Sequence, residues 1–312
     1  MNAPLSVLAF VAGVALVVAA TERLLEGLVG IASALRLAPF VVSAVLSGLE
    51  AENIAVGLIA GHNNQAEIAL GTAFGGATFL VCIALGLGAV VAPLRVTLPK
   101  GVVYLLAGAP IVSGLALLGG TTARLSGVVL LLAFAAAMMY LVSASKNHTF
   151  VDSSEVREAL QEPCKLWVSA IVSIAGIAVI TGGGELVAQG ASGVISAFGV
   201  PALLMGMVIT PAAIEAEEVV RQIVPAKRGF PDVAAGNVIG TVLYFTLFNL
   251  GLIALITPVA VPRLTRLLDW PFLVGVSLLA AFFLLRGRVT RLGGLVLVVL
   301  GVTYGALHVF AR

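Results

Sequence analysis

The sequence predicts an all-α polytopic membrane protein whose ten transmembrane helices form two inverted five-helix repeats. Three observations lead to this fold class. First, 60% of the 312 residues are hydrophobic and 10% are charged, whereas soluble domains contain about 45 to 50% apolar residues. Second, ten apolar segments long enough to span a bilayer can be placed along the chain. Third, the two halves of the chain resemble each other, as described below.

Five apolar segments form the first half, residues 1–145. They run from Leu5 to Ala20 (continuing amphipathically to about Ala34), Pro39 to Ala60, Ile68 to Pro93, Val102 to Leu118 and Leu125 to Ser143. A charged stretch, Lys146 to Lys165, follows them. Charged residues are costly in the hydrocarbon core, so we expect this stretch to be a cytoplasmic linker.

Five further segments form the second half, residues 166–312. They run from Trp167 to Val187 (continuing to about Phe198), Ala202 to Val224, Val233 to Pro258, Trp270 to Leu285 and Leu292 to Phe310. The number and spacing of segments therefore match those of the first half.

The two halves also share residues at matching positions. Val11 to Ala34 overlays Ile174 to Ala197, and Glu50 to Gly76 overlays Glu215 to Thr241 at a separation of 165 residues. Chance similarity between apolar helices does not explain this, because the matches include a Glu-Ala-Glu triplet and several glycines. We interpret the chain as a tandem duplication.

Basic residues predict the orientation. With the amino terminus outside, twelve lysines and arginines fall on inner connections and four on outer ones, in agreement with the positive-inside rule. Because each half has five spans, the second half must enter the membrane from the opposite side. We therefore expect an inverted repeat, a plasma-membrane location and both termini outside. Inverted repeats are typical of alternating-access transporters.

Carboxylates inside the spans are the strongest functional signal. Each one costs about 2.5 to 3.5 kcal/mol near the centre of a membrane helix, so a counter-charge is expected. No lysine or arginine is repeated beside both triplets, which favours protons or a bound hard cation such as Ca2+ as the partner. The five acids of the repeated segments are Glu50, Glu52, Glu215, Glu217 and Glu218.

Helical spacing selects a metal site from these acids. Residues three apart share a helix face, which groups Glu50 with Asn53 and Glu215 with Glu218. Glu52 and Glu217 then point away and are secondary candidates. We expect Gly48 and Pro211 to loosen the helix before each group, and the glycine pairs Gly71/Gly75 and Gly236/Gly240 to permit close helix approach.

The inverted spans, the segment Gly183 to Pro201 and an acidic segment followed by Ala234 to Thr241 resemble the cation/calcium antiporter superfamily, which contains the sodium/calcium and calcium/proton exchangers. The resemblance covers nearly the whole chain. It implies that Glu218 and Asn53 occupy the positions of the two calcium-binding glutamates of the family's GTSLPE motifs. The hydroxyl positions of those motifs hold Leu49, Glu50, Ile214 and Glu215 here.

The function predicted on this basis is antiport of Ca2+ or a similar divalent cation against H+ or Na+. Leu49 and Ile214 replace sodium-binding hydroxyls and neighbouring acids favour a shared proton, so protons are slightly preferred. Two alternatives remain open: a non-transporting or channel-like protein with a structural cation site, and a proton-coupled transporter of another solute.

The remaining sequence features argue against some functional classes and add little to the site. HExxH, GxSxG and P-loop motifs are absent, so we expect no enzyme and no cofactor. The net charge of +2 gives no support for a nucleic-acid partner, and inorganic cations and the lipid bilayer are the expected partners. The sequence does not indicate an oligomeric state. We expect Asp269 at a span edge, His62, His148 and His308 in contact with solvent, and Glu22 and Glu185 to orient helices.

Overall fold

The computed structural model describes residues 2–34, 50–145, 166–227, 229 and 231–310, and within these ranges it leaves several side chains undescribed, among them those of Glu22 and Glu217. The described chain is helical apart from one two-stranded pairing. The predicted linker, His148 and the first part of the span expected at Pro39 to Ala60 lie outside these residues.

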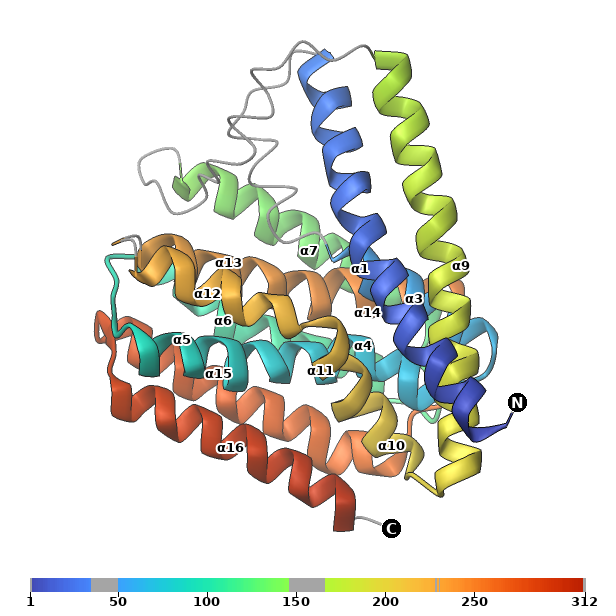
Figure 1. The fold of residues 1–312 in the computed structure, drawn as a ribbon. Coiled ribbons are helices and arrows are strands. Elements are labelled where there is room, and N and C mark those ends of the chain that lie inside the picture. The colour runs from blue at the N-terminus through green and yellow to red at the C-terminus, as the bar shows by residue number, and fades with distance from the viewer. Residues whose placement is uncertain (1, 35–49, 146–165, 228, 230, 311–312) are drawn as a thin grey trace.

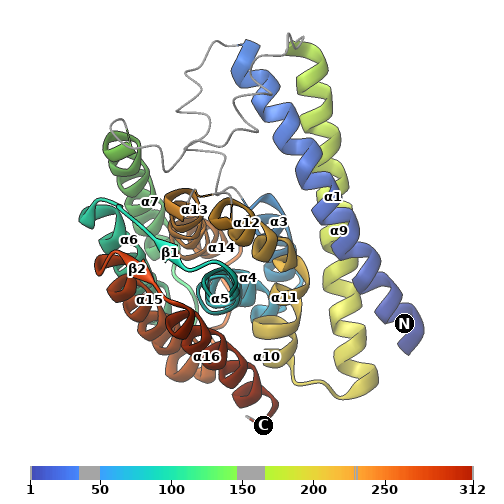
Figure 2. The same ribbon diagram turned by 60° about the vertical axis from the view of Figure 1, so that its left-hand side comes forward.

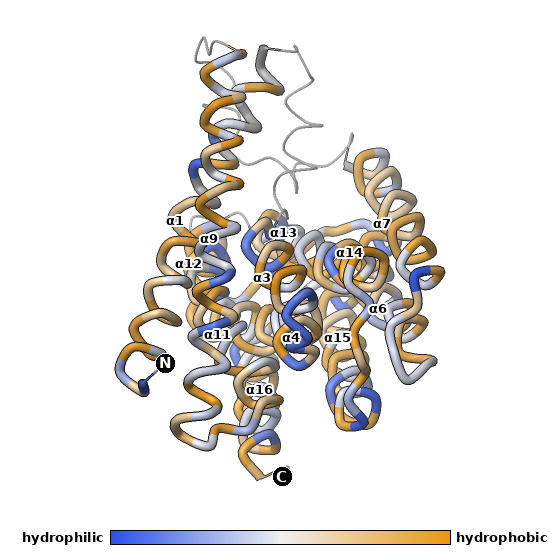
Figure 3. The backbone as a smooth tube through the Cα atoms, turned by 90° about the vertical axis from the view of Figure 1, so that its right-hand side faces the viewer, coloured by the Kyte–Doolittle hydropathy of each residue, from blue (hydrophilic) through white to orange (hydrophobic). Residues whose placement is uncertain are grey.

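Within the described ranges, eight helices are long and apolar enough to cross a membrane. Hydrophobic residues continue along α1, α7 and α9 (Figure 3). The eight spans are Ala3–Ala20, Ala66–Val91, Lys100–Leu117, Arg124–Ala144, Leu166–Phe198, Pro231–Ile256, Thr265–Leu285 and Arg291–Phe310. They belong to α1 (Ala3–Ala34), α4 to α5, α6 (Lys100–Ser113) with a short 3-10 extension, α7 (Arg124–Ser145), α9 (Leu166–Phe198), α13 to α14, α15 (Trp270–Leu285) with the turn before it, and α16 (Arg291–Phe310).

Two of these spans form the centre of the bundle and have matching shapes. One consists of α4 (Ala66–Phe79), a π-helical segment (Leu80–Ala84) and α5 (Leu85–Val91); the other consists of α13 (Pro231–Leu243), a π-helical segment (Tyr244–Asn249) and α14 (Leu250–Ile256). Each is 26 residues long. Figure 2 shows α4 and α5 enclosed by the other core helices.

The long helices α1 and α9 lie side by side and cross one flank of this core (Figure 1). Glycines permit their close contact: a side chain at Gly190 would meet the backbone nitrogen of Phe10 at 2.4 Å, and one at Gly13 would meet that of Val187 at 2.7 Å. Small residues at such positions allow helix backbones to approach in a membrane.

Two short antiparallel pairings mark opposite ends of the bundle. β1 (Leu94–Arg95) pairs with β2 (Arg288–Val289), and an isolated bridge joins Thr121 to Ala260. Because β1 precedes α6 and Thr121 follows it, the pairings lie at the two ends of that helix. Arg95 and Ala260 are 165 residues apart, so corresponding connections of the two halves are involved.

Corresponding helical turns also lie at opposite ends. The turn between α12 (Ala216–Lys227) and α13 is at the β1 end, where Asp232 accepts hydrogen bonds from the amide (2.7 Å) and hydroxyl (2.6 Å) of Thr97. The turn between α3 (Ala51–His62) and α4 is at the other end, where Gly61 packs against Thr257.

The predicted span from Ala202 to Val224 is interrupted, in agreement with the expectation that Pro211 loosens the helix before the carboxylates. The structure divides it into α10 (Ala202–Leu204), a π-helical segment (Met205–Ile209), α11 (Thr210–Ile214) and α12. The interruption at Glu215 comes four residues after Pro211, and proline weakens a helix because it lacks a backbone N–H and its ring crowds the preceding turn.

The predicted glycine contacts are confirmed only in part. A side chain at Gly71 would meet the carbonyl oxygen of Gly206 at 1.9 Å, and one at Gly75 would meet that of Met207 at 2.4 Å. Gly240, in contrast, faces open space, because no helix packs closely on α13 at that position.

Two expectations about edge residues are also wrong. Asp269 and His308 are fully buried where the turn before α15 meets the end of α16. Asp269 Oδ1 accepts a hydrogen bond from the hydroxyl of Tyr304 at 2.9 Å and lies 2.8 Å from His308 Nε2. These polar groups satisfy one another away from solvent, which hydropathy alone could not reveal. His62 is exposed, as predicted.

Candidate functional site

The predicted metal-site residues come together in the interior of the bundle. The exposed fraction is 3% for Glu50, 1% for Glu215 and Glu218, and zero for Asn53. Glu50 and Asn53 belong to the first half of the chain, and Glu215 and Glu218 to the second. Ionised groups are rarely buried unless they are paired, so three carboxylates buried in one region of the bundle make that region the candidate site.

The ends of two helices position the two groups, Glu50 with Asn53 and Glu215 with Glu218. Glu50 precedes the first residue of α3 and has φ −96° and ψ 72°, while Glu215 separates α11 from α12 with φ −84° and ψ 5°. Each acid therefore lies at the amino-terminal end of a 12-residue helix. The partial positive charge of a helix amino terminus stabilises a nearby carboxylate.

A side-chain hydrogen bond joins the two halves at this point. Asn53 Nδ2 donates to Glu215 Oε1 at 2.5 Å. The amide oxygen of Asn53 is also buried and has no hydrogen-bond donor among the described residues. Asn53 thus holds Glu215 with the nitrogen of its amide and has a buried oxygen without a donor at the other end.

Glu218 has partners that the sequence did not indicate. Arg221 Nη1 lies 2.7 Å from Glu218 Oε1, and Asn237 Nδ2 donates to Glu218 Oε2 at 2.9 Å. The side chain of Arg221 is 40% exposed, whereas that of Glu218 is buried. No basic residue is repeated beside both triplets, which favours protons or a cation as partners of the acids, but Arg221 of the second half alone pairs with Glu218; the spacing of three residues on α12 is the signal that identifies it.

Glu52 is closer to the centre than predicted. Its exposed fraction is 2%, and its charge interacts with those of Glu50 and Glu218. The prediction that it points away assumed a helix from Glu50 onward, but the helix begins at Ala51. The side chain of Glu217 lies outside what the structure describes.

The electrostatics of Glu50 are dominated by removal from water. The second largest effect on the Glu50 carboxylate is repulsion by three other carboxylates, Glu215 first and then Glu52 and Glu218. Arg221 has a smaller, opposing effect. A bound cation or proton would relieve this repulsion, because each neutralises excess negative charge in a region of low dielectric constant.

The donor set suits a hard cation, although it is not closed around one. Carboxylate and amide oxygens are the ligands that Ca2+ and Mg2+ prefer. In the described residues, however, no three His, Cys, Asp or Glu side chains converge closely enough to hold a metal ion. Glu215 contacts Asn53 and Glu218 contacts Arg221 instead, so cation binding requires these side chains to exchange partners.

Further polar residues are buried on α11, α12 and the two central spans. Thr210 and Gln222 are each 1% exposed, and their side-chain polar atoms have no hydrogen-bond partner in the described part of the chain. Asn249 Nδ2 donates to Thr72 Oγ1 at 3.1 Å beside Gly57 of α3. The sequence does not indicate these residues, because a single polar residue in an apolar span carries little signal.

Comparison with protein families gives a match across both halves. The family described as "Sodium/calcium exchanger protein" matches residues 5–143 and 168–310.

Curated relatives cover most of the chain. Inner membrane protein YrbG of Escherichia coli (strain K12) is 25% identical over 289 residues, which are 88% of this chain and 87% of YrbG. The protein named "Putative antiporter CaxA" of Alkalimonas amylolytica is 24% identical over 302 residues, which are 94% of this chain and 95% of CaxA.

Solved structures share the fold. Structures of the sodium-calcium exchanger NCX_Mj superpose with TM-scores of 0.60 and 0.61 at 21% and 22% identity, and they cover 97% of this chain and 98 to 99% of theirs. The described helices therefore adopt the exchanger fold.

Proposed function

Because the chain belongs to the sodium/calcium exchanger protein family, we propose that it is a secondary active antiporter that exchanges a divalent cation for protons or sodium. Ca2+ is the first candidate for the divalent cation. The observation that carries the proposal is the meeting of Glu50, Asn53, Glu215 and Glu218, buried and contributed by both halves.

When a cation binds at this centre, the contacts of Glu215 with Asn53 and of Glu218 with Arg221 would be replaced by contacts with the cation. Glu50, Glu215 and the free amide oxygen of Asn53 supply oxygen ligands, and Glu218 joins them when it leaves Arg221. The cation also removes the repulsion between Glu50 and Glu215. The resulting gain in binding free energy must be moderate, because a carrier has to release its ion as well as bind it.

Arg221 has a defined part in this proposal. Its guanidinium keeps Glu218 neutralised inside the bundle while no cation is bound, and its partial exposure gives it access to water when it is displaced. An isolated buried carboxylate would otherwise be strongly destabilising. The ion pair thus provides a resting state for the carrier.

The geometry also supports an inverted repeat with ten spans. The turns after α3 and α12 correspond in sequence and lie at opposite ends of the bundle. Inverted repeats allow alternating access around a fixed central site. With the twelve-to-four distribution of basic residues, we propose that both termini lie outside the plasma membrane.

Protons are the preferred counter-ion. Glu50 and Glu215 stand where the family carries hydroxyl groups, and adjacent carboxylates cannot both be ionised at low cost. One proton shared between them would maintain the unloaded centre at a lower charge. Sodium coupling would require oxygen ligands that Leu49 and Ile214 do not provide.

Isotope uptake into proteoliposomes tests the proposal. Imposed H+ and Na+ gradients are compared for Ca2+, Mg2+ and Mn2+. We expect 45Ca2+ accumulation driven by a pH gradient and collapsed by a protonophore. Uptake that needs a Na+ gradient would reverse the counter-ion assignment, and gradient-independent leak would favour a channel-like protein with a structural cation site.

A further inference from the structure

A polar cavity of about 490 Å3 opens between α9 and the turn that joins α3 to α4. It is separate from the buried carboxylates: Asn63 lies ten residues beyond Asn53, which corresponds to about 15 Å along a helix. Its polar lining residues are Asn63 and Gln65 from the turn and Glu185, Gln189, Ser192 and Ser196 from α9.

The polar residues of α9 form one stripe on an otherwise apolar helix. Their spacings of four, three and four residues place them on a single helix face. Other faces of α9 expose large apolar residues such as Ile171, Ile174 and Ile177. The stripe therefore marks the side of α9 that meets water and the core of the protein.

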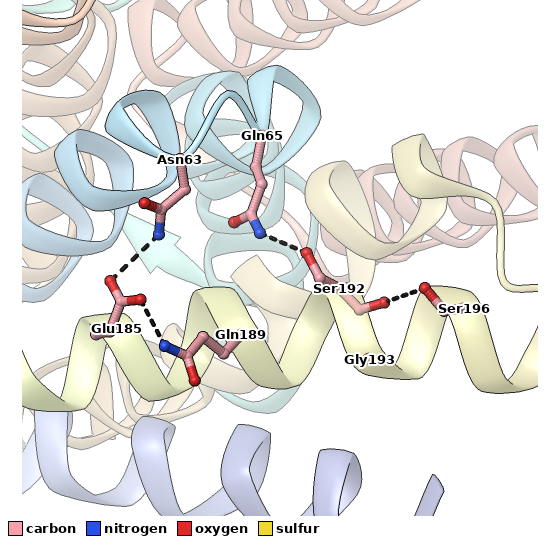
Figure 4. Close-up of a pocket in the computed structure, with 7 residues that line it drawn as sticks. All are labelled: Asn63, Gln65, Glu185, Gln189, Ser192, Gly193 and Ser196. Atoms are coloured by element: carbon pink, nitrogen blue, oxygen red, sulfur yellow. Dashed lines mark hydrogen bonds between the residues drawn. The ribbon is translucent and has the colours of Figure 1, made fainter. Parts of the chain in front are cut away.

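Glu185 is the only charged residue among those that line the cavity. Asn63 Nδ2 donates to its Oε2 at 3.2 Å, and Gln189 Nε2 donates to its Oε1 at 2.7 Å. In Figure 4 these two amides approach the carboxylate from the turn and from the next turn of α9. A carboxylate accepts about four hydrogen bonds, so further lone pairs remain for a ligand.

Additional oxygen atoms surround this carboxylate. Gln65 donates to Ser192 Oγ and to the carbonyl of Ala188, and its own amide oxygen is buried without a donor in the described residues. The cavity therefore combines one negative charge with uncommitted oxygen acceptors. Such a lining is suited to a cation and unfavourable for an anion.

The volume of the cavity indicates whether a cation bound there could keep its shell of water. Six waters at about 30 Å3 each occupy roughly 180 Å3, so a hexahydrated divalent ion fits within it. One carboxylate cannot replace the hydration shell of such an ion, so binding through its waters is expected.

We propose that this cavity is a docking site for a hydrated divalent cation, with Glu185 as the charged group that binds the ion through its waters and Asn63 and Gln189 as the amides that orient this carboxylate. The site concentrates the ion at the mouth beside the α3–α4 turn before the ion reaches the buried carboxylates. This inference rests on the proposed function for its role in transport, while the binding itself can be measured independently.

A titration with Mn2+ followed by electron paramagnetic resonance, which reports the free ion, tests the docking site on the detergent-solubilised full chain. We expect a tight and a weaker class of site in the wild type. Glu185→Gln should lose only the weaker class and Glu215→Gln only the tight one. Glu67→Gln, which alters an acid on α4 that does not line the cavity, should keep both.

Uptake kinetics complete the test. Glu185→Gln should raise the KM for divalent cations three- to tenfold at low ionic strength and leave the maximal rate unchanged. Persistence of the weaker class in Glu185→Gln, its absence from the wild type, or its loss in Glu67→Gln would overturn the docking site. If the wild type binds Mn2+ in both classes but transports no divalent cation, the proposed function fails while the docking site stands.

Discussion

Asn53 and Glu215 are 162 residues apart in the chain, yet a hydrogen bond joins their side chains in the interior of the bundle. One residue follows the start of α3, and the other separates α11 from α12. The bond therefore connects the helix ends that the two halves contribute to the centre. A change that repels these ends from each other should disturb ion binding before it disturbs the rest of the fold.

The first prediction concerns the difference between the acidic Glu218 and the neutral Asn53, which stand at corresponding positions of the two halves. Glu218→Gln should abolish divalent cation transport because it removes a buried charge from the site. Asn53→Ala should weaken binding about tenfold, which corresponds to about 1.4 kcal/mol, because it removes one neutral ligand and the donor that holds Glu215. Calorimetry and uptake on the same variants measure both effects. Unchanged binding and transport in Glu218→Gln would assign this carboxylate a structural role.

The second prediction concerns the ion pair between Arg221 and Glu218. Arg221→Gln removes a cation that competes with the transported ion for Glu218, so divalent binding should become tighter. Because Arg221 is partly exposed, the gain should be about 1 kcal/mol, or roughly fivefold. Arg23→Gln, which breaks an exposed ion pair on α1, serves as the control and should leave affinity unchanged. Weaker divalent binding in Arg221→Gln would contradict the proposal that Arg221 competes with the transported ion for Glu218.

The third prediction is topological. In a background with Cys82 and Cys164 replaced by serine, Asn63→Cys should react with a membrane-impermeant maleimide from outside intact cells. Gly229→Cys should react only after permeabilisation, because the two turns lie at opposite ends of the bundle. Labelling of both positions from the same side would exclude an inverted repeat.

The fourth prediction concerns stability. His308→Leu leaves Asp269 buried with Tyr304 as its remaining described partner, and breaking a buried pair in this way costs about 3 kcal/mol or more. The thermal unfolding midpoint in detergent should fall. His62→Leu changes an exposed histidine and should leave the midpoint unchanged. Equal midpoints for the two variants would show that the Asp269 cluster does not stabilise the bundle.

Most of the fold could be predicted from hydropathy and the repeat. The spans beginning near Ala66, Pro231 and Arg291 agree with the predicted segments to within a few residues, because long apolar runs in lipid have to be helical. Pro211 predicted a weakened helix before the carboxylates, but the exact position of the break at Glu215 could not be predicted, since it depends on contacts in the finished bundle. The burial of Asp269 and His308 depends likewise on contacts between distant helices.

The sequence identified acids that the structure buries together, but it did not indicate their contacts. The repeated triplets identified Glu50, Glu215 and Glu218, and alignment of the halves added Asn53. Helical spacing failed for Glu52 because Glu50 lies before the helix and not within it. The pairing of Glu218 with Arg221 has no counterpart in the first half, so the similarity of the halves does not indicate it.

Calcium counterflow is the most direct test of exchange at the buried carboxylates. Proteoliposomes loaded with unlabelled Ca2+ are diluted into 45Ca2+ without any imposed gradient of another ion. We expect the wild type and Glu26→Gln, an exposed acid on α1, to accumulate label in proportion to internal Ca2+, and Glu215→Gln to accumulate none. Label uptake that is independent of internal Ca2+, or equal uptake by Glu215→Gln, would contradict the account.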